Sequence, residues 1–66
     1  MKKEKIEKIF SSKDSLLDSG LSIFIVTKHH RLMPYEVTYN TVYSDEKIFD
    51  EFWQIDIKDV ECFEIA

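Results

Sequence analysis

Two adjacent histidines, His29 and His30, are the residues of this chain best suited to acid–base chemistry, and Lys28 and Arg31 flank them. Paired imidazoles can serve as general acid and general base, and neighbouring cations can hold a phosphate, which together would suit a minimal ribonuclease. Such catalysis needs its groups on opposite sides of a pocket, whereas all four residues fall in one short predicted loop. We therefore interpret the segment as a solvated loop tip and expect no catalytic residue and no enzyme.

Metal binding is limited by the supply of nitrogen and sulfur ligands. A structural zinc site takes four Cys or His side chains, and the chain has three such residues, His29, His30 and Cys62. Cys62 lies in an apolar predicted strand without a neighbouring base, so we interpret it as a buried, inert thiol. A chain with one glycine has no Gly-rich phosphate loop. We expect no metal and no cofactor.

The segment from Lys28 to Arg31 also has a nucleic-acid interpretation. Its cations suit phosphates, and three nearby tyrosines, Tyr35, Tyr39 and Tyr43, alternate on one face of a predicted strand, where aromatic rings could stack on bases. The net charge of −4 opposes a polyanion, and the tyrosines are explained more simply as core residues and cross-strand pairs. Direct nucleic-acid contact through Lys28, His29, His30 and Arg31 stays as the alternative.

The carboxyl-terminal third of the chain is strongly acidic. Residues 44–66 carry eight Asp or Glu side chains against two lysines, a net charge of −6. Asp45 and Glu46 follow Ser44, a good N-cap, so the dipole of a predicted helix explains them. The other six carboxylates have no such explanation; they are Asp50, Glu51, Asp56, Asp59, Glu61 and Glu64. They form either a solvated face or a surface for a basic partner, whose charge would resemble the phosphates of a nucleic acid.

The apolar pattern predicts a small α+β domain with the order α-β-β-α-β, in which helices pack on one face of an antiparallel sheet. The expected elements are a helix over 2–18, strands over 21–28 and 35–43, a helix over 45–53 and a strand over 54–65. The strand over 21–28 is apolar on both faces, which is typical of a central strand.

Three details refine these elements. Lys13, which follows two serines, interrupts the apolar stripe of the first helix and predicts a kink there. The second helix is expected to bury one face, formed by Ile48, Phe49, Phe52 and Trp53. In the last strand the apolar alternation changes phase at Lys58-Asp59, which predicts a bulge or a tight turn.

Composition favours one globular domain over residues 1–66. The chain of 7.9 kDa is 44% hydrophobic and has nine aromatic residues, unlike a disordered segment. Its longest apolar run, Ile23 to Val26, is far below the ~20 residues that span a bilayer. The single cysteine excludes an intrachain disulfide, and charged residues interrupt any signal-peptide core. We expect a cytoplasmic protein.

The sequence as a whole predicts a small, acidic, non-enzymatic protein-binding module. Inhibitors and adaptors commonly have this profile, for example phage-type inhibitors of host or defence proteins, antitoxins and immunity proteins; this is association by class. The expected partner is a larger protein with a basic surface. Trp53 would be an aromatic anchor at the rim of the second helix. The expected contacts are Asp50, Glu51, Trp53, Asp56, Asp59 and Glu61.

Overall fold

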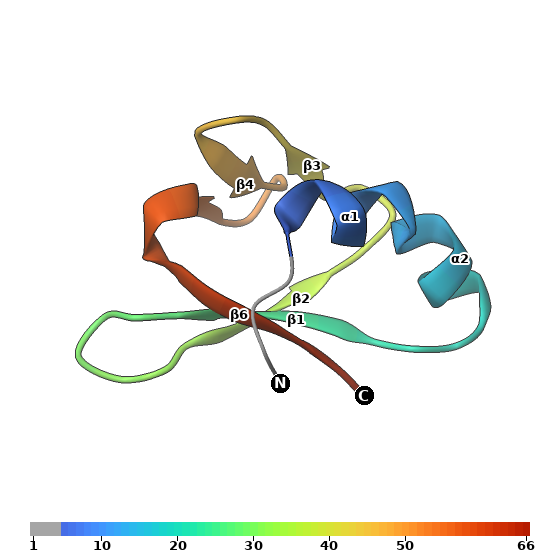
Figure 1. The fold of residues 1–66 in the computed structure, drawn as a ribbon, viewed down its shortest axis with the longest axis horizontal. Coiled ribbons are helices and arrows are strands. Elements are labelled where there is room, and N and C mark those ends of the chain that lie inside the picture. The colour runs from blue at the N-terminus through green and yellow to red at the C-terminus, as the bar shows by residue number, and fades with distance from the viewer. Residues whose placement is uncertain (1–4) are drawn as a thin grey trace.

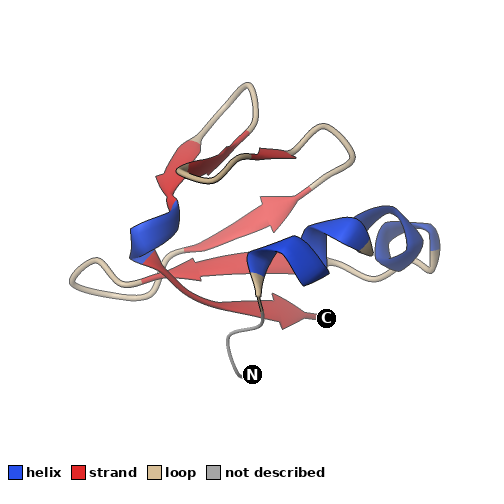
Figure 2. Ribbon diagram, turned by 45° about the horizontal axis from the view of Figure 1, so that its top comes forward, coloured by secondary structure: helices blue, strands red, loops and turns tan. Residues whose placement is uncertain are grey.

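Two short helices near the amino terminus lie against a body of strands (Figures 1 and 2). The structure is a computed structural model that describes residues 5–66. Helix α1 spans Ile6–Ser11 and helix α2 spans Lys13–Asp18. No helix in this part of the chain is long and apolar enough to cross a membrane.

The two helices meet at a kink. Ser11 and Ser12 donate their hydroxyl hydrogen bonds to the carbonyl of Lys8, at 2.9 and 3.1 Å, and such back-bonding bends helices. The kink predicted beside Lys13 is therefore confirmed, whereas one continuous helix over 2–18 is wrong. Residues 2–4 of that prediction lie outside the described residues.

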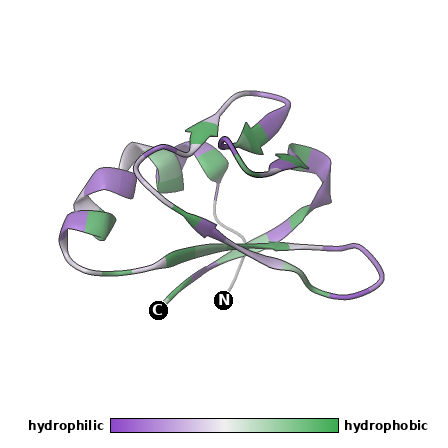
Figure 3. Cartoon of the chain, turned by 180° about the vertical axis from the view of Figure 1, so that it is seen from behind, coloured by the Kyte–Doolittle hydropathy of each residue, from purple (hydrophilic) through white to green (hydrophobic). Residues whose placement is uncertain are grey.

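A first antiparallel sheet contains β1 (Ile23–Thr27), β2 (Pro34–Val37) and β6 (Val60–Ile65), in the order β2-β1-β6. The central place predicted for the first strand is confirmed, since four of its five residues are buried. A loop over residues 28–33, with a hydrophilic tip, joins β1 to β2 (Figure 3).

The predicted strand over 35–43 is divided by a turn. The Thr38 N–H donates to the Thr41 hydroxyl at 2.9 Å, and the Thr41 N–H donates to the Thr38 carbonyl at 3.1 Å. The alternation of apolar and polar residues that predicted one strand therefore continues through residues 38–41, where the backbone turns. After this turn the chain passes into a second antiparallel sheet, which contains β3 (Val42–Tyr43), β4 (Lys47–Phe49) and β5 (Gln54–Asp56) in that order.

The predicted helix over 45–53 is wrong, because this segment forms most of a β-hairpin. One carboxylate oxygen of Asp50 accepts hydrogen bonds from the N–H groups of Phe52 and Trp53, at 2.6 and 3.0 Å. The Asp50 N–H donates to the Trp53 carbonyl at 3.0 Å. These bonds close a tight turn between β4 and β5, which Asp side chains favour. Ser44, the expected helix cap, instead donates its N–H to the Lys47 carbonyl at 2.8 Å and closes the β3–β4 turn.

The predicted strand over 54–65 is interrupted at the predicted place. A short 3-10 helix over Ile57–Asp59 follows β5 and turns the chain into β6, which confirms the break at Lys58-Asp59. The fold is thus α+β, as predicted, but the order over residues 5–66 is two helices followed by six strands rather than α-β-β-α-β. Its Cα radius of gyration is 10.9 Å, near the value of roughly 11 Å for a compact chain of this length.

The core lies between the two sheets and α1. Phe10 of α1 stacks on Tyr43 of β3 at 5.3 Å between ring centroids, and meets the edge of Phe63 of β6 at 6.3 Å. One aromatic ring therefore joins the helix to both sheets. The buried apolar residues of the core are Ile9, Ile23, Ile25, Val37, Ile48, Ile55, Val60 and Phe63.

Candidate partner-binding surface

Carboxylates from three separate segments gather around the end of β5. Asp56 is the last residue of β5, and Asp59 is the last residue of the 3-10 helix. The N–H of Ile57 donates to the carbonyl of Glu46 at 2.9 Å, which holds the β3–β4 turn against this end of the strand. Asp45, Glu46 and Asp56 line one shallow depression of about 450 Å³, and Asp56 lines a second one together with Asp59. We call these four residues the acidic patch.

The acidic patch includes two residues that sequence reasoning had assigned to a helix dipole. Because no helix forms at 45–53, Asp45 and Glu46 lie exposed in the β3–β4 turn. Two lysines lie nearby: Lys58 lines the same depression, and Lys47 is the register partner of Asp56, although its Nζ is placed over the Phe49 ring at 4.9 Å. Four carboxylates against two lysines leave a net negative surface.

The depression shared by Asp56 and Asp59 is polar and has a volume of about 320 Å³. His29, from the β1–β2 loop, contributes to its lining, and its Nε2 lies 3.5 Å from Asp59 Oδ2. The N–H of Lys28 donates to the Asp59 carbonyl at 3.0 Å, which fastens the start of the loop to the 3-10 helix. The remaining lining residues are Thr27, Tyr35, Gln54 and Ile55. We call this cavity the polar depression.

Two of the expected contact residues have structural tasks. The Asp50 carboxylate accepts two backbone hydrogen bonds inside the β4–β5 turn, so it is not a free surface charge. Trp53 does not lie at a helix rim; it is half-buried and its ring centroid lies 5.4 Å from that of Tyr35. Glu51, in the same turn, and Glu61, on β6, are exposed and line neither depression of the acidic patch.

Exposed apolar side chains also occur outside the acidic patch, and sequence reasoning missed them. Phe52, expected in the core, is 84% exposed at the β4–β5 turn, because the turn replaces the helix face that would have buried it. Leu32 and Met33 in the β1–β2 loop are also exposed and line a shallow depression together with Tyr35. Tyr35 lines the polar depression as well, so apolar and acidic surfaces adjoin there.

The three tyrosines do not share one face, contrary to the predicted strand. Tyr35 packs against Trp53, Tyr43 stacks on Phe10 of α1, and the Tyr39 hydroxyl donates to Asp18 of α2 at 2.6 Å. They therefore form no joint platform for bases. All four residues proposed for nucleic-acid contact, Lys28, His29, His30 and Arg31, are exposed, and His29 lies beside Asp59.

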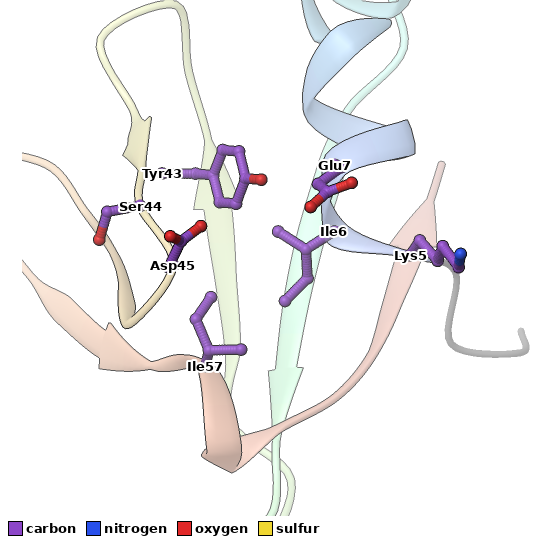
Figure 4. A pocket seen from close by; sticks show the side chains of 7 residues that line it. All are labelled: Lys5, Ile6, Glu7, Tyr43, Ser44, Asp45 and Ile57. Carbon is purple, nitrogen blue, oxygen red and sulfur yellow. The ribbon is translucent and has the colours of Figure 1, made fainter.

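A further cavity, of about 300 Å³, separates α1 from β3 and the 3-10 helix (Figure 4). Ile6, Tyr43 and Ile57 form its apolar wall, and Asp45 connects it to the acidic patch. Partial burial raises the pKa of Tyr43, and the negative charges of Glu7 and Asp45 raise it further. Because the described lining has two carboxylates, Glu7 and Asp45, against the single cation Lys5, this cavity extends the negative surface towards α1.

Cys62 is half-buried on β6, rather than fully buried as expected. Within residues 5–66, no three His, Cys, Asp or Glu side chains are grouped so as to hold a metal ion. Comparison of the chain with protein-family models, curated proteins and solved structures finds no match.

Proposed function

We propose that this protein is a small non-enzymatic binding module, an inhibitor or adaptor, which places its acidic patch on the basic surface of a larger protein. The observation that carries the proposal is the hydrogen bond from Ile57 to Glu46. It brings carboxylates from the β3–β4 turn beside those of β5 and the 3-10 helix. A concentrated negative surface of this kind steers association with a basic partner.

The neighbouring apolar residues support docking on a protein. Protein interfaces commonly surround a few apolar and aromatic anchors with a polar rim. Phe52, at 84% exposure, is the most exposed of the large apolar side chains within residues 5–66 and the strongest anchor candidate; it lies at the other end of β5 from Asp56, so a partner that contacts both would cover the length of this strand. Leu32 and Met33 provide a second exposed apolar surface on the β1–β2 loop. An inhibitor of a nucleic-acid-binding protein fits this combination, with the carboxylates occupying the partner's phosphate sites.

The proposal is tested by capture of partners from a lysate of the source cells on the immobilised protein, with and without nuclease. We expect a protein that survives nuclease and is released by salt, because screening weakens exposed charge pairs beyond a distance of about 10 Å at 0.1 M salt. Capture that disappears on nuclease treatment would instead support the alternative, contact of nucleic acid with residues 28–31. Retention unaffected by salt would contradict the role of the acidic patch.

A further inference from the structure

The polar depression has the composition of a receptor for one cationic side chain. Its two carboxylates come from different elements, Asp56 from β5 and Asp59 from the 3-10 helix, and the Gln54 amide adds a further oxygen acceptor to the lining. Asp59 is only half-exposed, so a cation seated here would be partly removed from water. The described lining contains no Lys or Arg side chain that already occupies it.

A buried hydroxyl gives a second, independent indication. Thr27 lines the depression and is 1% exposed. Its Oγ1 has no hydrogen-bond partner within residues 5–66, which is uncommon for a buried polar atom and calls for an explanation. The accessible surface of this atom is below 1 Å², so a ligand with N–H donors that binds in the depression would reach it after a small shift of the neighbouring side chains.

We propose that the polar depression receives an arginine side chain of the partner protein; this inference rests on the proposed function. The guanidinium group is planar and has five N–H donors, so it can bond to two carboxylates and an amide at once and lie against an aromatic ring. Tyr35 provides that ring in the lining, and cations favour the faces of aromatic rings. A lysine ammonium has three donors around a point and matches this spread of acceptors less well.

His29 marks where the arginine would be located. Its Nε2 is 3.5 Å from Asp59 Oδ2, so a permanent positive charge at this position would compete for the same carboxylate. The substitution His29→Lys therefore introduces a tethered competitor. His30→Lys is the matched control, because it adds the same charge one residue away, on an exposed residue that does not line the depression.

The test is an NMR titration of the isotope-labelled protein with N-acetyl-arginine amide, N-acetyl-lysine amide and the uncharged N-acetyl-citrulline amide at constant ionic strength. We expect saturable shifts of the Thr27, Gln54 and Asp59 amides with the arginine compound, with a dissociation constant on the order of 1 mM for a single side chain. His29→Lys should weaken this binding about tenfold or more, whereas His30→Lys should leave it within about twofold.

Isosteric variants confirm the ligand groups. Asp56→Asn and Asp59→Asn should each reduce the shifts while retaining the dispersed spectrum of a folded chain. Absence of saturable shifts, equal shifts with citrulline or lysine amide, or equal effects of the two histidine variants would each overturn the arginine assignment. The titration needs no partner, so its outcome is separate from that of the capture experiment: a basic partner captured by a protein that fails the titration leaves the proposed function standing and removes the pocket.

Discussion

The hydroxyl of Tyr39 donates to a carboxylate oxygen of Asp18 at 2.6 Å, which joins the end of α2 to the turn between the two sheets. At the other end of the helix, Lys13 Nζ donates to the carbonyls of Tyr39 and Thr41, at 3.2 and 2.8 Å. A helix of six residues is not stable in isolation. These contacts therefore hold α2 over residues 38–41, where the chain passes from one sheet to the other.

The Tyr39–Asp18 bond makes stability fall in alkaline solution. The hydrogen bond to Asp18 raises the pKa of Tyr39, and partial burial and the negative charges of Asp18 and Asp14 raise it further. The folded chain thus holds the phenolic proton more tightly than the unfolded chain, whose tyrosines ionise near pH ~10. Stability from this bond is complete below that pH and is lost as the pH rises through the folded pKa. Urea unfolding from pH 7 to pH 11 should show the wild type losing its advantage over Tyr39→Phe; a constant difference would contradict this.

Lys13 should stabilise the fold through its two carbonyl contacts. Lys13→Met keeps most of the aliphatic chain but removes both hydrogen bonds, one of them to the partly buried Thr41 carbonyl. We expect a loss of about 1–3 kcal/mol, the usual cost of leaving such a group without its charged partner. Lys28→Met, in an exposed loop position, is the control with the same change of charge. Equal melting temperatures of the two variants would show that the contacts of Lys13 contribute nothing.

Substitution of two phenylalanines distinguishes the observed fold from one that contains the helix predicted over 45–53. Phe63 is fully buried and Phe52 is 84% exposed. Phe63→Ala should cost about 3–5 kcal/mol, and Phe52→Ala should stay within about 0.5 kcal/mol. Chemical denaturation measures both. If Phe52 is also an anchor, its variant should bind the captured partner more weakly at an unchanged melting temperature; a large loss of stability in Phe52→Ala would contradict the observed turn.

Asp50 and Glu51 are neighbours in one turn but should respond differently to substitution. Asp50→Ala removes an acceptor of two backbone hydrogen bonds, and should cost about 1–3 kcal/mol. Glu51→Ala changes an exposed side chain and should stay within about 0.5 kcal/mol. Urea unfolding of the two variants, which carry the same net charge, makes the comparison. A similar stability of both would show that the turn does not depend on the Asp50 carboxylate.

The local pattern of apolar residues predicted the structure correctly where a single strand or a single break in a strand was concerned. The apolar, β-branched segment Ile23–Thr27 is a central strand, and the phase change at Lys58-Asp59 is a real turn. The pattern was ambiguous at Ile48, Phe49, Phe52 and Trp53, whose spacing fits one face of a helix. The same spacing arises when a turn separates two short strands, and an Asp can begin either structure.

The acidic patch was predicted only in part, for a related reason. The expected contacts Asp56 and Asp59 do lie together in the polar depression. Asp45 and Glu46 were not counted as contacts, because the dipole of the predicted helix explained them. The hydrogen bond that adds them to the patch joins Glu46, just before β4, to Ile57, just after β5. Contacts of this kind leave no trace in periodicity or local composition. The exposure of Phe52 was missed for the same reason, since it follows from the turn.

Charge reversal within the acidic patch tests the proposed docking surface most directly. Asp45→Lys with Glu46→Lys changes two exposed residues that do not line the polar depression, so it leaves the inferred arginine site intact. The control is Glu36→Lys with Glu64→Lys, which changes the charge equally on two exposed residues that flank Phe24 in the first sheet.

Surface plasmon resonance with the captured partner should show association slowed about tenfold or more at low salt by the patch variant, because steering acts mainly on the association rate. The control should follow the wild type within about threefold, since exposed charges far from an interface are screened. The difference should shrink as salt rises, and equal slowing by both pairs would mean that net charge alone, and not the patch, guides the protein to its partner.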